Sequence, residues 1–143
     1  MIETKIDNLE GMTARQAYRY ARDVIRGRWL EAEAIIVTAP YPAYLYSYYV
    51  LKDRWPEAEV TIATNPGVAY LYSRDVIKGR FPKGESVIAA DTYSAYRYAR
   101  DIIKGRWPEA EAVIATNFER AYSYAREVIK GKDGQAWLNQ HGL

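Results

Sequence analysis

The segment from Ala95 to Glu111 reads AYRYARDIIKGRWPEAE, and close copies of it recur along the chain every 26 residues without insertion or deletion. Each copy opens with the block Ala-Tyr-x-Tyr, which begins at Ala17, Ala43, Ala69, Ala95 and Ala121. A fixed period of about 20 to 50 residues is typical of stacked units that are stable only against their neighbours. The sequence therefore predicts an all-α fold, an α-solenoid of five 26-residue helix-turn-helix repeats.

Two short helices are expected in each repeat, with Ala17 taken as position 1. The first begins at position 24, where Pro66 suits the first helical turn and Asn65 before it serves as N-cap. We expect it to end at position 11, where a glycine supplies the left-handed residue that closes a helix. These glycines are Gly27, Gly79, Gly105 and Gly131. The second helix begins at a proline such as Pro108 and ends near the threonine at position 22.

The spacing of apolar residues predicts which side chains form the core. At about 100° per residue, positions 1, 4, 5, 8 and 9 of the first helix form one apolar arc, with the tyrosine of position 2 at its edge. The second helix contributes the aromatic residue of position 13, alanine at 16 and isoleucine at 20. We expect a single domain over 1–143, with repeats at 17–131 and caps at 1–16, which include Ile6 and Leu9, and at 132–143.

The block from Ala95 to Glu111 resembles tandem repeats in uncharacterised proteins of bacteriophages, and the resemblance covers residues 17–131. What it implies is a viral, phage-encoded helical repeat protein that acts in the cytoplasm of a bacterial host, with no catalytic residues to carry over. In general shape the chain is also similar to tetratricopeptide and Sel1-like arrays. Its period is shorter than theirs, so their ligand-binding positions cannot be transferred.

Composition disfavours several classes of function. The net charge of +2 predicts no whole-molecule attraction to nucleic acid or to an anionic membrane. With no cysteine and one histidine, His141, neither a metal site nor another cofactor is expected. The N-terminus does not read as a signal peptide, so a cytoplasmic location is expected. Because no nucleophile–base pair, phosphate-binding loop or metal-ligand spacing occurs, the sequence predicts a non-enzymatic protein.

The repeat also gives an interpretation for most tyrosines and basic residues. Ten of the 14 tyrosines fall at positions 2 and 4, where we expect them to pack between repeats rather than to stack on bases. A basic residue also stands at positions 10 and 12 of every repeat. We interpret both rows as ladders of ion pairs with the carboxylates that open the second helix. Binding of single-stranded nucleic acid along this basic, tyrosine-bearing face is the alternative function.

The candidate binding site lies where repeat 2 departs from the consensus. Its first helix carries Tyr41, Leu45, Tyr48 and Tyr49 at i, i+4, i+7 and i+8, positions where other repeats place mainly arginine, aspartate, serine or glycine. Leu71 and Tyr93 extend the pattern into the following repeats. We expect this apolar face to bind a protein partner, such as a host protein. Self-association, or cover by residues 1–12, are the alternatives.

A second departure is the run Phe81-Pro82-Lys83-Gly84-Glu85, in which glycine replaces the alanine of position 16. Glycine costs a helix about 1 kcal/mol relative to alanine, so this helix is predicted to be the weakest. We interpret the change as tolerated drift, with a flexible joint as the alternative.

Overall fold

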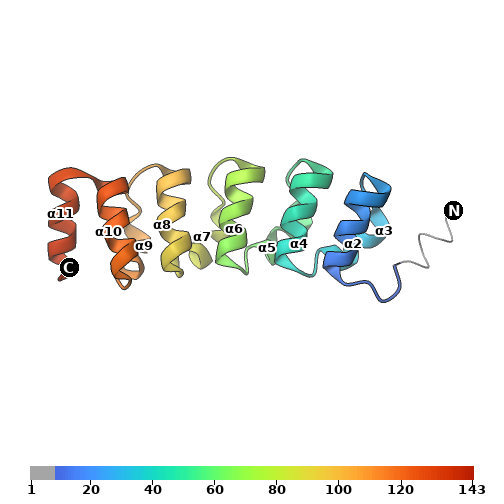
Figure 1. The fold of residues 1–143 in the computed structure, drawn as a ribbon, viewed down its shortest axis with the longest axis horizontal. Coiled ribbons are helices and arrows are strands. Elements are labelled where there is room, and N and C mark those ends of the chain that lie inside the picture. Colours follow the sequence, from blue (N-terminus) through green and yellow to red (C-terminus); the bar gives the residue numbers. More distant parts are fainter. Residues whose placement is uncertain (1–8) are drawn as a thin grey trace.

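The computed structural model describes residues 9–143, which contain ten α-helices and no strand. The all-α class predicted from the sequence is confirmed. The helices stand side by side in a row that runs from α2 to α11 (Figure 1). Ile6, which the sequence assigns to the N-terminal cap, lies outside the described residues, whereas Leu9 packs against the core.

Each repeat contributes a first helix that consists of an α-helical part and a π-helical last turn. These parts are α2 (Ala14–Tyr20) with η1 (Ala21–Ile25), α4 (Pro40–Leu45) with η2 (Tyr46–Leu51), α6 (Pro66–Tyr72) with η4 (Ser73–Ile77), α8 (Thr92–Tyr98) with η5 (Ala99–Ile103), and α10 (Phe118–Tyr124) with η6 (Ala125–Ile129). Consecutive first helices contact one another, α2 with α4, α4 with α6, and so on to α10. They form one layer of the molecule.

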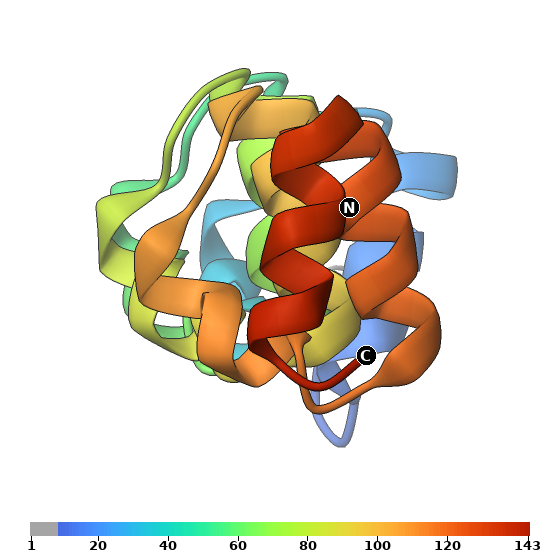
Figure 2. The ribbon, with the colours of Figure 1, turned by 90° about the vertical axis from the view of Figure 1, so that its left-hand side faces the viewer.

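The second helices form another layer behind the first, as the view along the row shows (Figure 2). They are α3 (Leu30–Ile36), the 3-10 turn η3 (Pro56–Ala58) with α5 (Glu59–Ile62), α7 (Pro82–Ala89) and α9 (Pro108–Ile114). In the last repeat α11 (Gly131–Gln140) follows η6 directly. Its Trp137 and Leu138 are buried, and Trp137 packs on Tyr124 as the position-13 aromatic does in the other repeats.

The predicted starts of the first helices are confirmed. The side chains of Asn65, Asp91 and Asn117 accept hydrogen bonds from backbone N–H groups three residues ahead. Thr13 forms a reciprocal capping box with Gln16 before α2. These side chains satisfy backbone donors that have no partner inside the helix.

The predicted left-handed glycine at position 11 is wrong for Gly27, Gly79 and Gly105, whereas Gly131 has a φ of 58°. The left-handed residue is the basic residue of position 10, with φ between 55° and 59° in the first four repeats, whereas Gly27, Gly79 and Gly105 have no positive φ. The reason is the π-helical last turn, in which the N–H of position 10 bonds to the carbonyl of position 5, at 2.8 Å for Lys78 and Ser73. In this wider turn the chain reverses one residue earlier than in an α-helical ending.

The same turn changes the predicted core. Positions 1, 2, 4 and 5 are buried in most repeats, but positions 8 and 9 are only partly buried, and Val24 is 60% exposed. Residues that follow position 5 rotate away from the seam between the layers because the π-turn holds more residues than an α-turn. On the second helices the predictions are confirmed, since Trp55, Ala58 and Ile62 and their equivalents are buried.

A cluster of a buried tyrosine, a glutamate and a partly exposed arginine joins the repeats. Between repeats 2 and 3, the Tyr72 hydroxyl accepts the N–H of Trp55 at 2.9 Å and donates to Glu59 at 2.8 Å. Arg54 donates two hydrogen bonds of 2.9 Å to the same carboxylate, which confirms the predicted ion pairing of position 12. The equivalent tyrosines at the other junctions are Tyr46, Tyr98 and Tyr124.

Phe81 and Gly84, which replace the consensus tryptophan and alanine, contact each other, so we interpret the two replacements as coupled rather than as tolerated drift. A Cβ on Gly84 would lie 2.8 Å from Cδ2 of Phe81 and 3.1 Å from Cβ of Ala69. The phenyl ring thus occupies the space that an alanine methyl fills in the tryptophan-bearing repeats. No break interrupts α7, which is the longest of the second helices in repeats 1 to 4.

Candidate functional site

The structure brings the tyrosines of repeat 2 together on one face of α4 and η2. Their rings form a continuous series, with centroid separations of 6.0 Å from Tyr41 to Tyr44, 6.2 Å from Tyr44 to Tyr48 and 4.8 Å from Tyr48 to Tyr49. Tyr41, Tyr48 and Tyr49 are 47%, 41% and 51% exposed, whereas Leu45 is half-buried. We call Tyr41, Leu45, Tyr48 and Tyr49 the repeat-2 face.

Leu71 and Tyr93, predicted to extend this face, lie in different surroundings. Leu71 is half-buried on α6, the neighbour of α4, and packs against the core. Tyr93 lies between the guanidinium groups of Arg97 and Arg120, 4.9 and 4.3 Å from its ring centre. Arg97 also covers the ring of Tyr70 at 4.2 Å. Tyr93 therefore belongs to a cation–π cluster on α8 and α10 rather than to the tyrosine series.

Tyr48 and Tyr49 of the repeat-2 face occupy positions that in the later repeats belong to a second cluster of contacts between repeats. Tyr44, at position 2, donates a 2.5 Å hydrogen bond to Asp75 of the next repeat, and Arg74 binds both oxygens of that carboxylate. Tyr70 with Asp101, and Tyr96 with Glu127, repeat the arrangement. Burial and the hydrogen bond to Asp75 raise the pKa of Tyr44, so the hydroxyl stays a donor at neutral pH.

This second cluster is missing between repeats 1 and 2. Tyr48 and Tyr49 stand where the cluster requires its arginine and its carboxylate. The buried Tyr18 is left with one hydrogen bond, which its hydroxyl accepts from Arg22 at 3.0 Å, and no carboxylate of the described residues accepts its proton. Repeat 2 thus gives up a recurring inter-repeat contact and exposes two tyrosines in its place.

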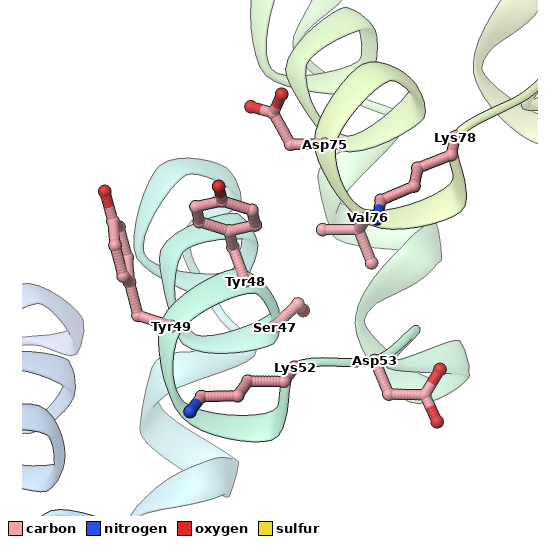
Figure 3. Close-up of a pocket in the computed structure, with 8 residues that line it drawn as sticks. All are labelled: Ser47, Tyr48, Tyr49, Lys52, Asp53, Asp75, Val76 and Lys78. Carbon is pink, nitrogen blue, oxygen red and sulfur yellow. The ribbon is translucent and has the colours of Figure 1, made fainter.

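A groove of about 420 Å³ lies beside these tyrosines, between η2 and η4. Figure 3 shows Tyr48 and Val76 on facing helices, with Lys52 and Lys78 at the ends of those helices. The equivalent groove between repeats 4 and 5 is about 120 Å³, with Arg100 at the position of Tyr48. The groove beside repeat 2 is therefore the larger of two matched sites.

The basic residues of position 10 are not paired as predicted. Their side chains form no hydrogen bond and no ion pair with any described residue, and all five are exposed. They are Arg26, Lys52, Lys78, Lys104 and Lys130. The prediction failed because the nearby second-helix carboxylates, such as Glu59, are already bound by the arginine of position 12.

Charge is also divided between the two layers, a feature that the net charge hides. The first-helix segments 14–26, 40–52, 66–78, 92–104 and 118–130 carry 13 lysines and arginines against five carboxylates. The segments between them, 27–39, 53–65, 79–91 and 105–117, carry five against nine. The surface around the repeat-2 face therefore belongs to the basic layer.

Most repeat tyrosines are unavailable to a ligand. Those of positions 2 and 4 are buried in repeats 2, 3 and 4, as the packing interpretation predicts. Tyr122 is an exception at 45% exposed, because no further repeat covers it, and it contacts the exposed Phe118. Sequence reasoning missed this pair because it treated all five repeats as equivalent.

No protein-family model, curated protein or solved structure matches this chain.

Within residues 9–143 no helix has the length and apolarity that crossing a bilayer requires. The same residues contain no group of three or more histidine, aspartate or glutamate side chains placed to hold a metal ion.

Proposed function

We propose that this protein is a non-enzymatic α-solenoid of five repeats that binds a protein partner through the repeat-2 face and the adjoining groove. A partner buries exposed tyrosines with little loss of side-chain entropy, which is why tyrosine is enriched at the centres of interfaces. The resemblance to phage tandem repeats makes a bacterial host protein the first class of partner to examine.

One observation carries the proposal. Repeat 2 has Tyr48 and Tyr49 at the two positions where repeats 1, 3 and 4 have arginine and aspartate. The exchange removes the carboxylate that would accept the proton of the buried Tyr18 and leaves both new rings more than 40% exposed. Within the described residues the new rings contact each other and, in the case of Tyr48, Tyr44, but no hydrogen bond takes the place of the one lost. Selection for binding accounts for a local sacrifice of stability of this kind.

The alternative function, binding of single-stranded nucleic acid, rests on the unpaired basic residues of position 10. These residues can contact phosphates. Stacking of successive bases, however, requires aromatic rings that are exposed repeat after repeat. In repeats 2, 3 and 4 the recurring tyrosines are buried, and exposed neighbouring tyrosines occur together only on the repeat-2 face among the described residues. The geometry therefore supports a protein partner better.

The test compares the wild type with a variant, Tyr48→Arg, Tyr49→Asp, that restores the consensus residues of the other repeats. Tagged proteins are used to isolate partners from a bacterial lysate, and the recovered partner is purified and titrated by calorimetry. We expect the variant to lose binding at least tenfold, since interface tyrosines each contribute on the order of 1–2 kcal/mol. Light scattering after size-exclusion chromatography reports whether the partner is a second copy of the chain.

Tyr122→Arg is the matched control, because it removes a tyrosine of similar exposure at the far end of the row. Binding should survive this change. Equal loss of binding in both variants, or binding that both retain, would remove the repeat-2 face as the site. A steep fall in affinity with salt, together with retained binding of the Tyr48→Arg, Tyr49→Asp variant, would favour the nucleic-acid function instead.

A further inference from the structure

The repeat-2 face is apolar at its centre and basic at its border. No charged residue occurs from Pro40 to Leu51, the whole of α4 and η2, and the next residue, Lys52, is the first charged one after this stretch. Lys52 and Lys78 both line the groove beside Tyr48. A ligand on this face therefore meets aromatic rings and, at their edge, two ammonium groups.

Lys52 and Lys78 share one backbone conformation, and neither side chain has a partner among the described residues. Each lies in the left-handed conformation at the end of a π-turn, with φ of 55° at Lys52 and 59° at Lys78. Neither side chain has a hydrogen bond or ion pair with a described residue. Their ammonium groups are consequently available to a ligand in the groove.

Two carboxylates, Asp53 and Asp75, also line the groove, but neither forms an ion pair with Lys52 or Lys78. Asp75 accepts hydrogen bonds from Nε and Nη2 of Arg74 and from the hydroxyl of Tyr44. Asp53 accepts the backbone N–H of Arg54 at 2.7 Å, and its side chain points away from Tyr48 (Figure 3). With Arg74 counted, the groove region holds three cations against two carboxylates, an excess of one positive charge, and the two lysines carry no ion pair with a described residue.

We propose that the docked part of the partner is an acidic, amphipathic peptide segment. Its large apolar side chain enters the groove between Tyr48 and Val76, and its flanking carboxylates pair with Lys52 and Lys78. This inference rests on the proposed function and adds the chemistry of the partner. The complementarity follows from the surface, since an apolar centre selects apolar side chains and a basic border selects acidic ones.

The test is selection from a display library of random 16-residue peptides against the wild-type protein, with the Tyr48→Arg, Tyr49→Asp variant as the matched control. Peptides enriched on the wild type alone should combine leucine or aromatic residues with an excess of aspartate and glutamate. In fluorescence anisotropy, Lys52→Glu, Lys78→Glu should weaken them by roughly tenfold or more. The same charge reversal should enrich basic peptides in a repeated selection.

Each other outcome separates the two proposals. Peptides enriched on the wild type without an excess of acidic residues would overturn this inference and leave the proposed function standing. Equal enrichment on wild type and control would overturn both. A labelled single-stranded oligonucleotide that loses affinity in Lys52→Glu, Lys78→Glu but keeps it in Tyr48→Arg, Tyr49→Asp would assign the lysines to nucleic acid and also overturn the inference.

Discussion

At the scale of single residues, the packing depends on pairs that change together. Phe81 and Gly84 replace the tryptophan and alanine of the other repeats, and the ring of Phe81 fills the space of the missing methyl group. The sequence showed the glycine but not its partner, because a helix propensity carries no information about a neighbouring ring. The buried tyrosines of positions 2 and 4, by contrast, followed from the repeat alone.

We therefore expect Gly84→Ala to lower the free energy of unfolding by about 1–3 kcal/mol, the usual cost of overpacking. Combined with Phe81→Trp, which restores the consensus pair, the change should leave stability within about 0.5 kcal/mol of wild type. Urea denaturation of the two single variants and the double variant measures this coupling. A Gly84→Ala protein stabilised by about 1 kcal/mol, as helix propensity alone implies, would refute this coupling.

At the scale of elements, the start of each first helix was predictable and its end was not. Caps and N1 prolines are local signals, and they identified Asn65 and Pro66 correctly. The π-turn depends on how the end of the helix packs, so the sequence could not reveal that Lys104 rather than Gly105 is left-handed. The same rotation explains why positions 8 and 9 are less buried than predicted.

Replacement of Gly105 tests whether Lys104 or Gly105 is the left-handed residue of this turn. Its φ is not positive, and no atom lies within 4 Å of a Cβ built on it. Gly105→Ala should therefore be neutral or stabilising by up to about 1 kcal/mol through reduced entropy of the unfolded chain. A left-handed Gly105 would instead make alanine cost about 1–2 kcal/mol. Thermal and urea unfolding measure the difference, with the left-handed Gly131, where alanine should be destabilising, as the reference site.

At the scale of the whole molecule, ionisable clusters link every pair of neighbouring repeats and should limit stability at both pH extremes. Burial by itself raises the pKa of Glu59, but hydrogen bonds from Arg54, Tyr72 and Lys83 lower it to about 2. The pKa values of Glu85 and Glu111 are also lowered. In the alkaline range, burial raises the pKa of Tyr46 and of Tyr98 to about 12.

The sign of each shift fixes the pH dependence of folding. A lowered carboxylate pKa stabilises the folded state above the ordinary value of 4.5, and this contribution is lost as pH falls toward 2. A raised tyrosine pKa stabilises below the ordinary value of 10, and this contribution is lost as pH rises through 12. The urea midpoint should therefore be highest between these limits. Glu59→Gln should reduce the acid slope, and an unchanged slope would show that the clusters do not govern it.

The arrangement of the candidate site was predictable only in part. The repeat pointed to Tyr41, Tyr48 and Tyr49, which the structure brings together, but it placed Tyr93 with them although Arg97 and Arg120 hold that ring elsewhere. The unpaired lysines could not be recognised from the sequence. They have no ion pair because Arg54 and its equivalents bind the nearby glutamates.

We propose that repeat 2 exposes Tyr48 and Tyr49 for a ligand at the expense of a contact between repeats. The most direct measurement is the free energy of unfolding of the unliganded Tyr48→Arg, Tyr49→Asp variant in urea at neutral pH. We expect it to equal the wild-type value or exceed it by up to about 1 kcal/mol, because the new carboxylate can accept the proton of Tyr18 as Asp75 accepts that of Tyr44. A loss of more than about 1 kcal/mol would show that the two tyrosines stabilise the fold and are not kept for a ligand.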